Sequence, residues 1–139
     1  MGVQQLTLIV LTVIIIGISI SAGIIMFNQT LIRNNRLAII DDMNIFAGVA
    51  MTYYKTPVDM GGGNRTWNVD DMGPWFGYNY DAANDSMSNS NGTFVLSSDG
   101  DVLTIVGSGN EIGTNGSTNV EVVLTLTGDT SEIITTVNN

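Results

Sequence analysis

The side chains that most often perform catalysis or bind metals are scarce in this sequence. It contains no His and no Cys, which removes the commonest general base, the commonest metal ligand and all thiol chemistry. Without His a serine nucleophile cannot form a conventional triad, and no Gly-x-Ser-x-Gly turn occurs. We therefore expect no catalytic residue, no metal site and no cofactor, and predict that the protein is not an enzyme.

Two groups of acidic residues carry the oxygen ligands that calcium prefers. They are Asp99-Gly-Asp101 and Asp81-Ala-Ala-Asn84-Asp85. Neither has the spacing of the twelve-residue calcium loop with its closing Glu. Because Asp, Asn and Gly are also ordinary turn residues, we interpret both groups as turns.

A glycine-rich segment from Val106 to Gly113 has some likeness to a dinucleotide-binding loop. It follows an expected strand, but its third glycine lies one position late and no helical pattern comes after it. We reject cofactor binding there and interpret residues 107–118 as a glycine-containing link between strands.

Five Asn-x-Ser/Thr triplets are the remaining candidate modification sites. They begin at Asn28, Asn64, Asn84, Asn91 and Asn115. A chain rich in Asn, Ser and Thr produces several such triplets by chance, and Asn28 falls within an expected helix. Surface glycosylation of the other four is allowed by the sequence but not indicated by it.

The charges are unevenly distributed along the chain. All four basic residues (Arg33, Arg36, Lys55 and Arg65) lie in its first half, only acids follow them, and the formal net charge is −9. An acidic second half repels phosphate backbones, so we expect no nucleic-acid partner.

The element around which these residues must be arranged is an uncharged run from Leu6 to Phe27. Its 22 residues, as a helix, would cover about 33 Å, the thickness of a bilayer's hydrocarbon core. No Lys or Arg precedes the run, and the run is longer than the apolar core of a secretory signal, so we do not expect a cleaved signal. The run must be kept out of water by lipid, by other chains, or by each in turn.

The helical pattern continues past the run and becomes amphipathic. Ile39, Met43, Phe46, Ala50 and Tyr53 recur at steps of three and four, which places them on one face of a helix. Pro57 disfavours helical angles at Thr56, so the helix is predicted to end near Tyr54 or Lys55.

The rest of the chain predicts a small antiparallel sheet. The segment 56–92 is rich in Gly and Asn but contains several aromatics, which favours a loop packed on something. Period-two patterns predict strands at Thr93–Ser97, Val102–Val106, Val120–Thr127 and Glu132–Val137. A sheet this small needs a cover for its apolar face, including Val122, Leu124 and Leu126, and the amphipathic half-helix is the obvious one.

The predicted fold is therefore α+β, with a long N-terminal helix packed on a C-terminal antiparallel β head. We divide the chain into the helix at 1–55, the loop at 56–92 and the head at 93–139. Within the helix, residues 1–27 form the hydrophobic part and 28–55 the amphipathic part.

This organisation resembles that of type IV pilins. The start Met1-Gly-Val-Gln-Gln-Leu6, the pair Tyr53-Tyr54 before Pro57, and Met60-Gly-Gly-Gly63 are similar to a group of short bacterial pilin-like proteins. Many pilins have a basic leader, a Glu five residues into the mature chain and a C-terminal Cys pair. Here no basic leader is visible, the fifth residue is the neutral Gln5, and there is no Cys.

The resemblance implies a structural subunit that waits in the inner membrane and is then drawn by a pilus assembly machinery into an extracellular, cell-surface filament. Its main partner would be other copies of itself, in a helical homopolymer with the apolar helices in the core. The expected assembly interface is Gln5, Leu6, Ile9, Ile14, Gly17, Gly23, Phe27, Arg33, Arg36, Asp41 and Asp42. Arg33 and Arg36 would pair with Asp41 and Asp42 within a chain or between neighbours, or remain solvated.

Two other interpretations stay open at this level. The chain has the features of a single-span membrane protein with a small β head, and Arg33 and Arg36 after the span favour a cytoplasmic head under the positive-inside rule. Against this, a simple anchor does not need a long amphipathic continuation. A minor pilin or pseudopilin of a secretion system shares the architecture and differs in abundance.

Overall fold

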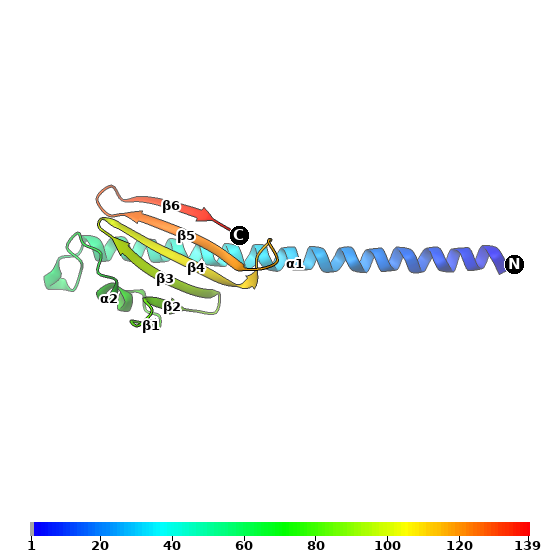
Figure 1. Ribbon diagram of the computed structural model, residues 1–139, viewed down its shortest axis with the longest axis horizontal. Coiled ribbons are helices and arrows are strands. Elements are labelled where there is room, and N and C mark those ends of the chain that lie inside the picture. Colours follow the sequence, from blue (N-terminus) through cyan, green and yellow to red (C-terminus); the bar gives the residue numbers. More distant parts are fainter. Residues whose placement is uncertain (1) are drawn as a thin grey trace.

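The computed structural model describes residues 2–139 as one long helix and one antiparallel sheet (Figure 1). Helix α1 runs from Gly2 to Lys55, 54 residues without a break, and is therefore about 81 Å long. Its C-terminal half lies against the sheet, whereas its N-terminal half projects beyond it with no other element alongside. The predicted α+β class is confirmed. Met1, which opens the expected helical segment, lies outside the described residues.

The sheet has six strands in sequence order, and every neighbouring pair is antiparallel. The strands are β1 (Tyr80–Asp81), β2 (Ser86–Ser88), β3 (Gly92–Asp99), β4 (Val102–Ile112), β5 (Asn119–Thr127) and β6 (Glu132–Val137). The last four correspond to the four that the sequence predicts. The first two lie in 56–92, which the sequence assigned to a loop, because strands of two and three residues are too short to show a period of two.

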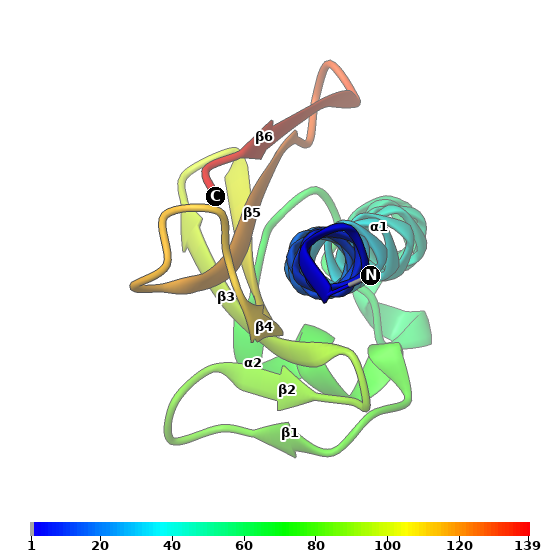
Figure 2. The same ribbon diagram turned by 90° about the vertical axis from the view of Figure 1, so that its right-hand side faces the viewer.

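The hydrophobic core lies between α1 and the concave face of the sheet, which curves around the helix (Figure 2). The helix contributes the five residues that the amphipathic pattern predicts, and each is at most 1% exposed. The sheet contributes the alternate residues of its three long central strands: Phe94, Leu96, Leu103, Ile105, Val122, Leu124 and Leu126. The predicted use of the half-helix as a cover is thus confirmed, and the core occupies only the C-terminal half of the molecule.

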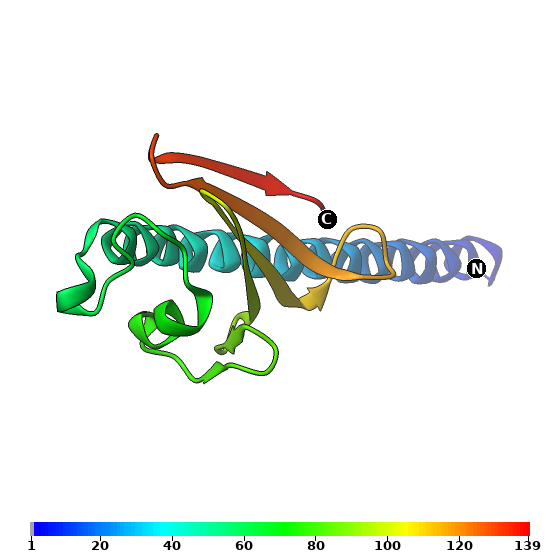
Figure 3. The ribbon, with the colours of Figure 1, turned by 60° about the vertical axis from the view of Figure 1, so that its left-hand side comes forward.

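The segment between α1 and the sheet wraps around the end of the helix (Figure 3). It forms η1 (Val58–Met60), α2 (Val69–Met72) and η2 (Gly73–Phe76). Its aromatic rings pack on helix residues: Phe76 on Phe46 with ring centroids 5.4 Å apart, and Trp67 on Tyr54 at 4.5 Å. The expectation that this segment is packed rather than disordered is confirmed.

The end of α1 agrees with the effect of Pro57 that the sequence predicts. The last carbonyls of the helix are satisfied by the chain as it turns back, since Gly63 N–H donates to Tyr53 O at 2.9 Å and Arg65 N–H donates to Tyr54 O at 2.7 Å. Gly61 has a φ of +80°, which a residue with a Cβ rarely adopts. The turn therefore terminates the helix and starts the packed loop in the same few residues.

The interpretation of residues 107–118 as a link is wrong for its first half, because β4 continues through it to Ile112. Two glycines inside the strand explain the difference. A Cβ on Gly107 would lie 2.8 Å from Ile39 Cγ2, and a Cβ on Gly109 would collide with the Asn35 amide. These glycines allow β4 to pass close to α1, and the sequence alone does not distinguish such a requirement from a flexible link.

The edge strand β6 extends past the cover that α1 provides (Figure 2). Ile133 pairs with Leu126 and Val137 with Val122, so these side chains share the inner face of the sheet. They are nevertheless 49% and 44% exposed, whereas their β5 partners are fully buried. The helix therefore covers the sheet only as far as β5.

Candidate assembly surface

The N-terminal half of α1 is exposed along its whole length. Every residue from Gly2 to Gln29 is exposed, including all the large apolar side chains of the run Leu6–Phe27. The helix is long and apolar enough to cross a membrane, and no residue of its most apolar stretch is buried inside the molecule. Such a surface is stable only against lipid or against other protein.

The four hydroxyl groups within this run are satisfied by the helix itself. Thr7 donates to Val3 O at 2.8 Å and Thr12 to Leu8 O at 2.7 Å. Ser19 and Ser21 likewise donate to the carbonyls four residues earlier, at 2.8 and 2.9 Å. Each hydroxyl therefore has a hydrogen-bond acceptor in its own helix, and none of them requires water.

Gly17 and Gly23 leave two bare positions on the exposed helix. A Cβ built on either glycine has no heavy atom within 4 Å outside the local helix backbone. The helix does not open at these positions, since α1 is continuous. Close approach by a neighbouring helix at these two glycines is therefore a prediction.

The other predicted interface residues are divided between residues 2–29 of α1, which we call the bare half, and the junction of α1 with the sheet. Five of them are exposed on the bare half: Gln5, Leu6, Ile9, Ile14 and Phe27. Arg33 and Asp41 are exposed at the junction. Arg36 and Asp42 are half-buried because the sheet begins to cover the helix at this level.

Arg36 and Asp42 each connect α1 to the head. Arg36 Nε donates to Asn139 O at 3.2 Å. Asp42 Oδ2 accepts from Asn89 Nδ2 at 2.9 Å and from Asn91 Nδ2 at 2.8 Å. Neither residue joins the intrachain Arg–Asp pairs that the sequence suggested.

Arg33 forms no hydrogen bond or ion pair within residues 2–139. The single ion pair over that range joins Arg65 Nη1 to Asp129 Oδ1 at 3.9 Å, between two well-exposed side chains. An exposed pair at that distance contributes little to stability. The guanidinium of Arg33 is therefore available to a second molecule.

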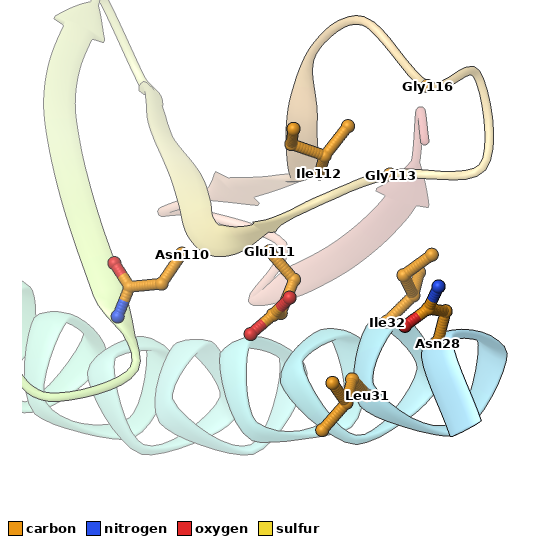
Figure 4. Close-up of a pocket in the computed structure, with 8 residues that line it drawn as sticks. All are labelled: Asn28, Leu31, Ile32, Asn110, Glu111, Ile112, Gly113 and Gly116. Carbon is orange, nitrogen blue, oxygen red and sulfur yellow. The ribbon is translucent and has the colours of Figure 1, made fainter. Parts of the chain in front are cut away.

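A groove of about 550 Å³ lies where the bare half of α1 meets the sheet (Figure 4). Its helix side is formed by Asn28, Leu31 and Ile32, and its other side by the end of β4 and the loop after it. Glu111 extends from β4 toward the helix in this groove. The Glu111 carboxylate makes no hydrogen bond or ion pair with any other described residue.

The groove exists because the end of β4 is fixed against α1. The backbone N–H of Glu111 donates to Asn35 Oδ1 at 3.2 Å, and Asn35 Nδ2 donates to Asn91 O at 2.9 Å. The following loop is closed by a 2.7 Å bond from Gly113 N–H to Thr118 O. Sequence reasoning missed Glu111 and Ile112 because it placed them in a free link. No alternation of residue types could have identified them, because Glu111 falls on the same face of β4 as the apolar Leu103 and Ile105.

A second polar cluster joins the end of α1 to the tips of two hairpins. Tyr54 Oη donates to Asp101 Oδ1 at 2.6 Å and lies 3.1 Å from Asp129 Oδ1. The hydrogen bond to Asp101 and the loss of solvent raise the pKa of Tyr54. The same hydrogen bond, together with the one from Asp129 N–H, lowers the pKa of Asp101. The cluster fixes the far end of the helix on the sheet.

The two acidic groups with calcium-type oxygen ligands, at residues 81–85 and 99–101, lie in turns. Asp81 accepts from Ala83 N–H at 3.0 Å and from Asn84 Nδ2 at 2.6 Å, which lowers the pKa of Asp81. Asp85 accepts from Tyr80 Oη at 2.8 Å. Among the described residues no three His, Cys, Asp or Glu side chains are grouped as metal ligands.

Three of the four candidate glycosylation asparagines use their amide nitrogen within the fold. Asn84, Asn91 and Asn115 donate to Asp81, Asp42 and Thr118 respectively. Asn64 is exposed in the turn after α1. Glycosylation of any of the other three would leave its amide nitrogen a single N–H for the hydrogen bond that it makes in the fold.

The comparisons with known proteins returned no match. No family model, no curated protein and no solved structure is similar to this chain at a significant level.

Proposed function

We propose that the protein is the structural subunit of a helical filament of the type IV pilus kind, assembled through the bare half of α1. The observation that carries this proposal is the division of a single continuous helix into a half with a covered face and a half with none. The covered half holds the head, and the bare half is left to contact other molecules.

The extent of the apolar surface favours a protein environment over lipid alone. Leu37 and Ile45 are 49% and 61% exposed on α1 at the level of the head. From Leu6 to Ile45 the helix is about 60 Å long, roughly twice the hydrocarbon thickness of a bilayer. A bilayer that covers the run Leu6–Phe27 therefore leaves Leu37 and Ile45 in water, whereas neighbouring helices reach both regions.

The continuity of α1 also favours a filament. A membrane anchor needs only a span and tolerates a flexible connection to its head. Here α1 continues from the bare half into the core as one helix from Gly2 to Lys55, so no loop separates the head from the apolar half. A lattice of packed helices then fixes the positions of the heads as well.

The proposed sequence of events follows from the same division. Before assembly the run Leu6–Phe27 lies in the inner membrane, and assembly exchanges lipid for neighbouring helices. Burial of apolar area at about 25 cal/mol per Å² stabilises the polymer against dissociation into water. The heads face solvent at the cell surface. A minor subunit of the same architecture would occupy the same place at lower abundance.

The test is recovery of the full-length protein from expressing cells, followed by electron microscopy and sedimentation. We expect long filaments that persist in high salt, because salt does not screen apolar burial. Recovery as detergent-solubilised monomers without filaments would support the competing proposal, a single-span membrane protein with a small β head.

A further inference from the structure

Two different surfaces of α1 lie at the same position along the helix axis, on the N-terminal side of the head. The first is the groove that contains Glu111. The second is a hollow of about 220 Å³ lined by Met26, Gln29, Thr30 and Arg33. Since successive helix residues are about 100° apart, the two surfaces are centred on nearly opposite sides of α1. A molecule that uses both would touch one neighbour on each side.

The charges on the two surfaces are opposite and unused. The Glu111 carboxylate and the Arg33 guanidinium have no hydrogen-bond or ion-pair partner within residues 2–139. Arg33 is exposed, and Glu111 is partly covered by the groove. A charge in a groove with low-polarity walls interacts more strongly with an incoming counter-charge than an exposed one does.

The apolar parts of the two surfaces also match. The groove side offers Leu31, Ile32 and Ile112, of which Ile112 is 54% exposed. The opposite side offers Met26, which is 68% exposed. An unbranched Met side chain adapts to irregular gaps between branched ones. Contact would therefore bury apolar area beside the charge pair.

We propose that the groove at Glu111 binds the Arg33 surface of a second copy of this chain. This inference rests on the proposed function and names the contact between neighbouring subunits. The copies join through two different surfaces, so the contact is heterologous, and its repetition produces an open helical polymer wherever the rotation between neighbours does not close a ring. A two-fold symmetric contact would need Glu111 and Arg33 to lie in one patch, whereas the two surfaces are centred on nearly opposite sides of α1.

The level of the two surfaces sets the arrangement of neighbours. Both lie within residues 26–33 of α1, apart from the β4 residues and loop that wall the groove. A parallel neighbour bound there is at a similar height along the axis, with its run Leu6–Phe27 beside that of the first copy. The contact is thus continuous with the apolar surface that the proposed function uses.

Cross-linking of the full-length chain tests the contact directly, because the native sequence has no Cys. Two variants are made, Arg33→Cys and Glu111→Cys, and each is oxidised alone and after co-expression with the other. We expect disulfide-linked dimers only when the two are co-expressed. Dimers of either variant alone in similar yield, or no dimers in the mixture, would overturn the proposal.

Charge reversal provides a second readout, the amount of sedimented filament. Glu111→Arg and Arg33→Glu are each expected to lower it at least about tenfold, and the double variant is expected to restore it, because the pair is reformed with its charges exchanged. Glu132→Arg and Lys55→Glu change exposed charges elsewhere and serve as controls that retain wild-type yield. Circular dichroism of each variant confirms that the head is folded.

The outcomes separate this inference from the proposed function. If the wild type forms no filaments, the proposed function fails, and cross-linking alone then decides whether the contact exists in another assembly. If the wild type forms filaments but single reversals sediment like the controls, this contact is wrong and the proposed function stands. A loss in both single variants without rescue in the double variant also contradicts the pairing.

Discussion

Gly107 of β4 lies directly beneath Ile39 of α1, so closely that a Cβ on the glycine would come within 2.8 Å of Ile39 Cγ2. Ile39 is fully buried and is the first residue of α1 that belongs to the core. The position at which the helix enters the head is therefore set by a residue that has no side chain.

Gly107→Val is expected to destabilise the head by about 1–3 kcal/mol, because the added atoms must displace Ile39 or the strand. The control is Gly48→Ala, at an exposed position of α1 where no atom lies within 4 Å of the added Cβ. That change is expected to stabilise the helix by up to about 1 kcal/mol. Urea denaturation of both variants measures the difference, and equal midpoints would show that β4 and α1 are not in close contact.

Phe46 is expected to be the most sensitive core position. Its ring packs edge-on against Phe94 at 4.8 Å and Phe76 at 5.4 Å. Phe46→Ala is expected to cost about 3–5 kcal/mol, and Phe46→Asp to unfold the head because an unpaired charge would enter the core. Ile45→Asp, at the adjacent exposed position, is the control and is expected to leave the circular dichroism spectrum unchanged.

Replacement of both Gly17 and Gly23 by Leu is expected to impair filament formation while membrane insertion continues. The positions are open on the isolated chain, so any loss must come from contacts with other chains. The matched control replaces Ile16 and Ile24 by Leu, which changes shape but not bulk. Membrane fractionation and electron microscopy separate insertion from assembly. Normal filaments from the double Leu variant would show that no neighbour approaches these glycines closely.

A chain that starts at Asn28 is expected to be soluble, monomeric and folded, since it retains every buried residue of α1 and lacks the run Leu6–Phe27. A chain that starts at Thr93 is expected to be unfolded. It loses the helix together with β1 and β2, and four strands without a cover bury too little apolar area. Circular dichroism and sedimentation of both test this. A folded Thr93–Asn139 fragment would mean that the sheet has a core of its own.

The Tyr54 cluster predicts how stability depends on pH at both extremes. The pKa of Asp101 is below its ordinary value of 3.8 in the folded chain, so its contribution is complete above that value and is lost as the pH falls through the folded pKa. The pKa of Tyr54 is raised, so its contribution is present below its ordinary value of 10.0 and is lost as the pH rises above it.

Tyr54→Phe is the variant that tests this pH dependence. Without the hydroxyl, Asp101 loses the main cause of its lowered pKa, so the melting temperature of the variant is expected to fall less between pH 5 and pH 2 than that of the wild type. The chain starting at Asn28 is suited to this measurement. Parallel acid-side curves for the two proteins would contradict the role assigned to the hydroxyl.

The sequence predicted those parts of the fold that depend on periodicity. The buried stripe from Ile39 to Tyr53 and the strand predicted at Val120–Thr127 are both found, because burial on one face leaves a repeat of 3.6 or 2 in the residue types. The extension of β4 to Ile112 was missed, because Gly107 and Gly109 are required by the approach of α1, and that approach is a tertiary property.

The candidate site was predictable only in part for the same reason. The exposure of the run Leu6–Phe27 and of Arg33 follows from local sequence. The groove at Glu111 depends on a contact between distant parts of the chain. Glu111 comes 80 positions after Leu31, and it lies beside the helix because its backbone N–H is bound by Asn35. No local pattern contains that information.

The first buried residue of α1 is Ile39, and this has a consequence for the energetics of the whole molecule. The head is stabilised by contacts of one set of atoms, and the transfer of the run Leu6–Phe27 out of water is driven by the burial of another set. The bare half can leave one apolar solvent and enter another without any change in the packing of the head. Transfer between the two environments is then a partition equilibrium of a folded particle, with a barrier set by desolvation and not by refolding.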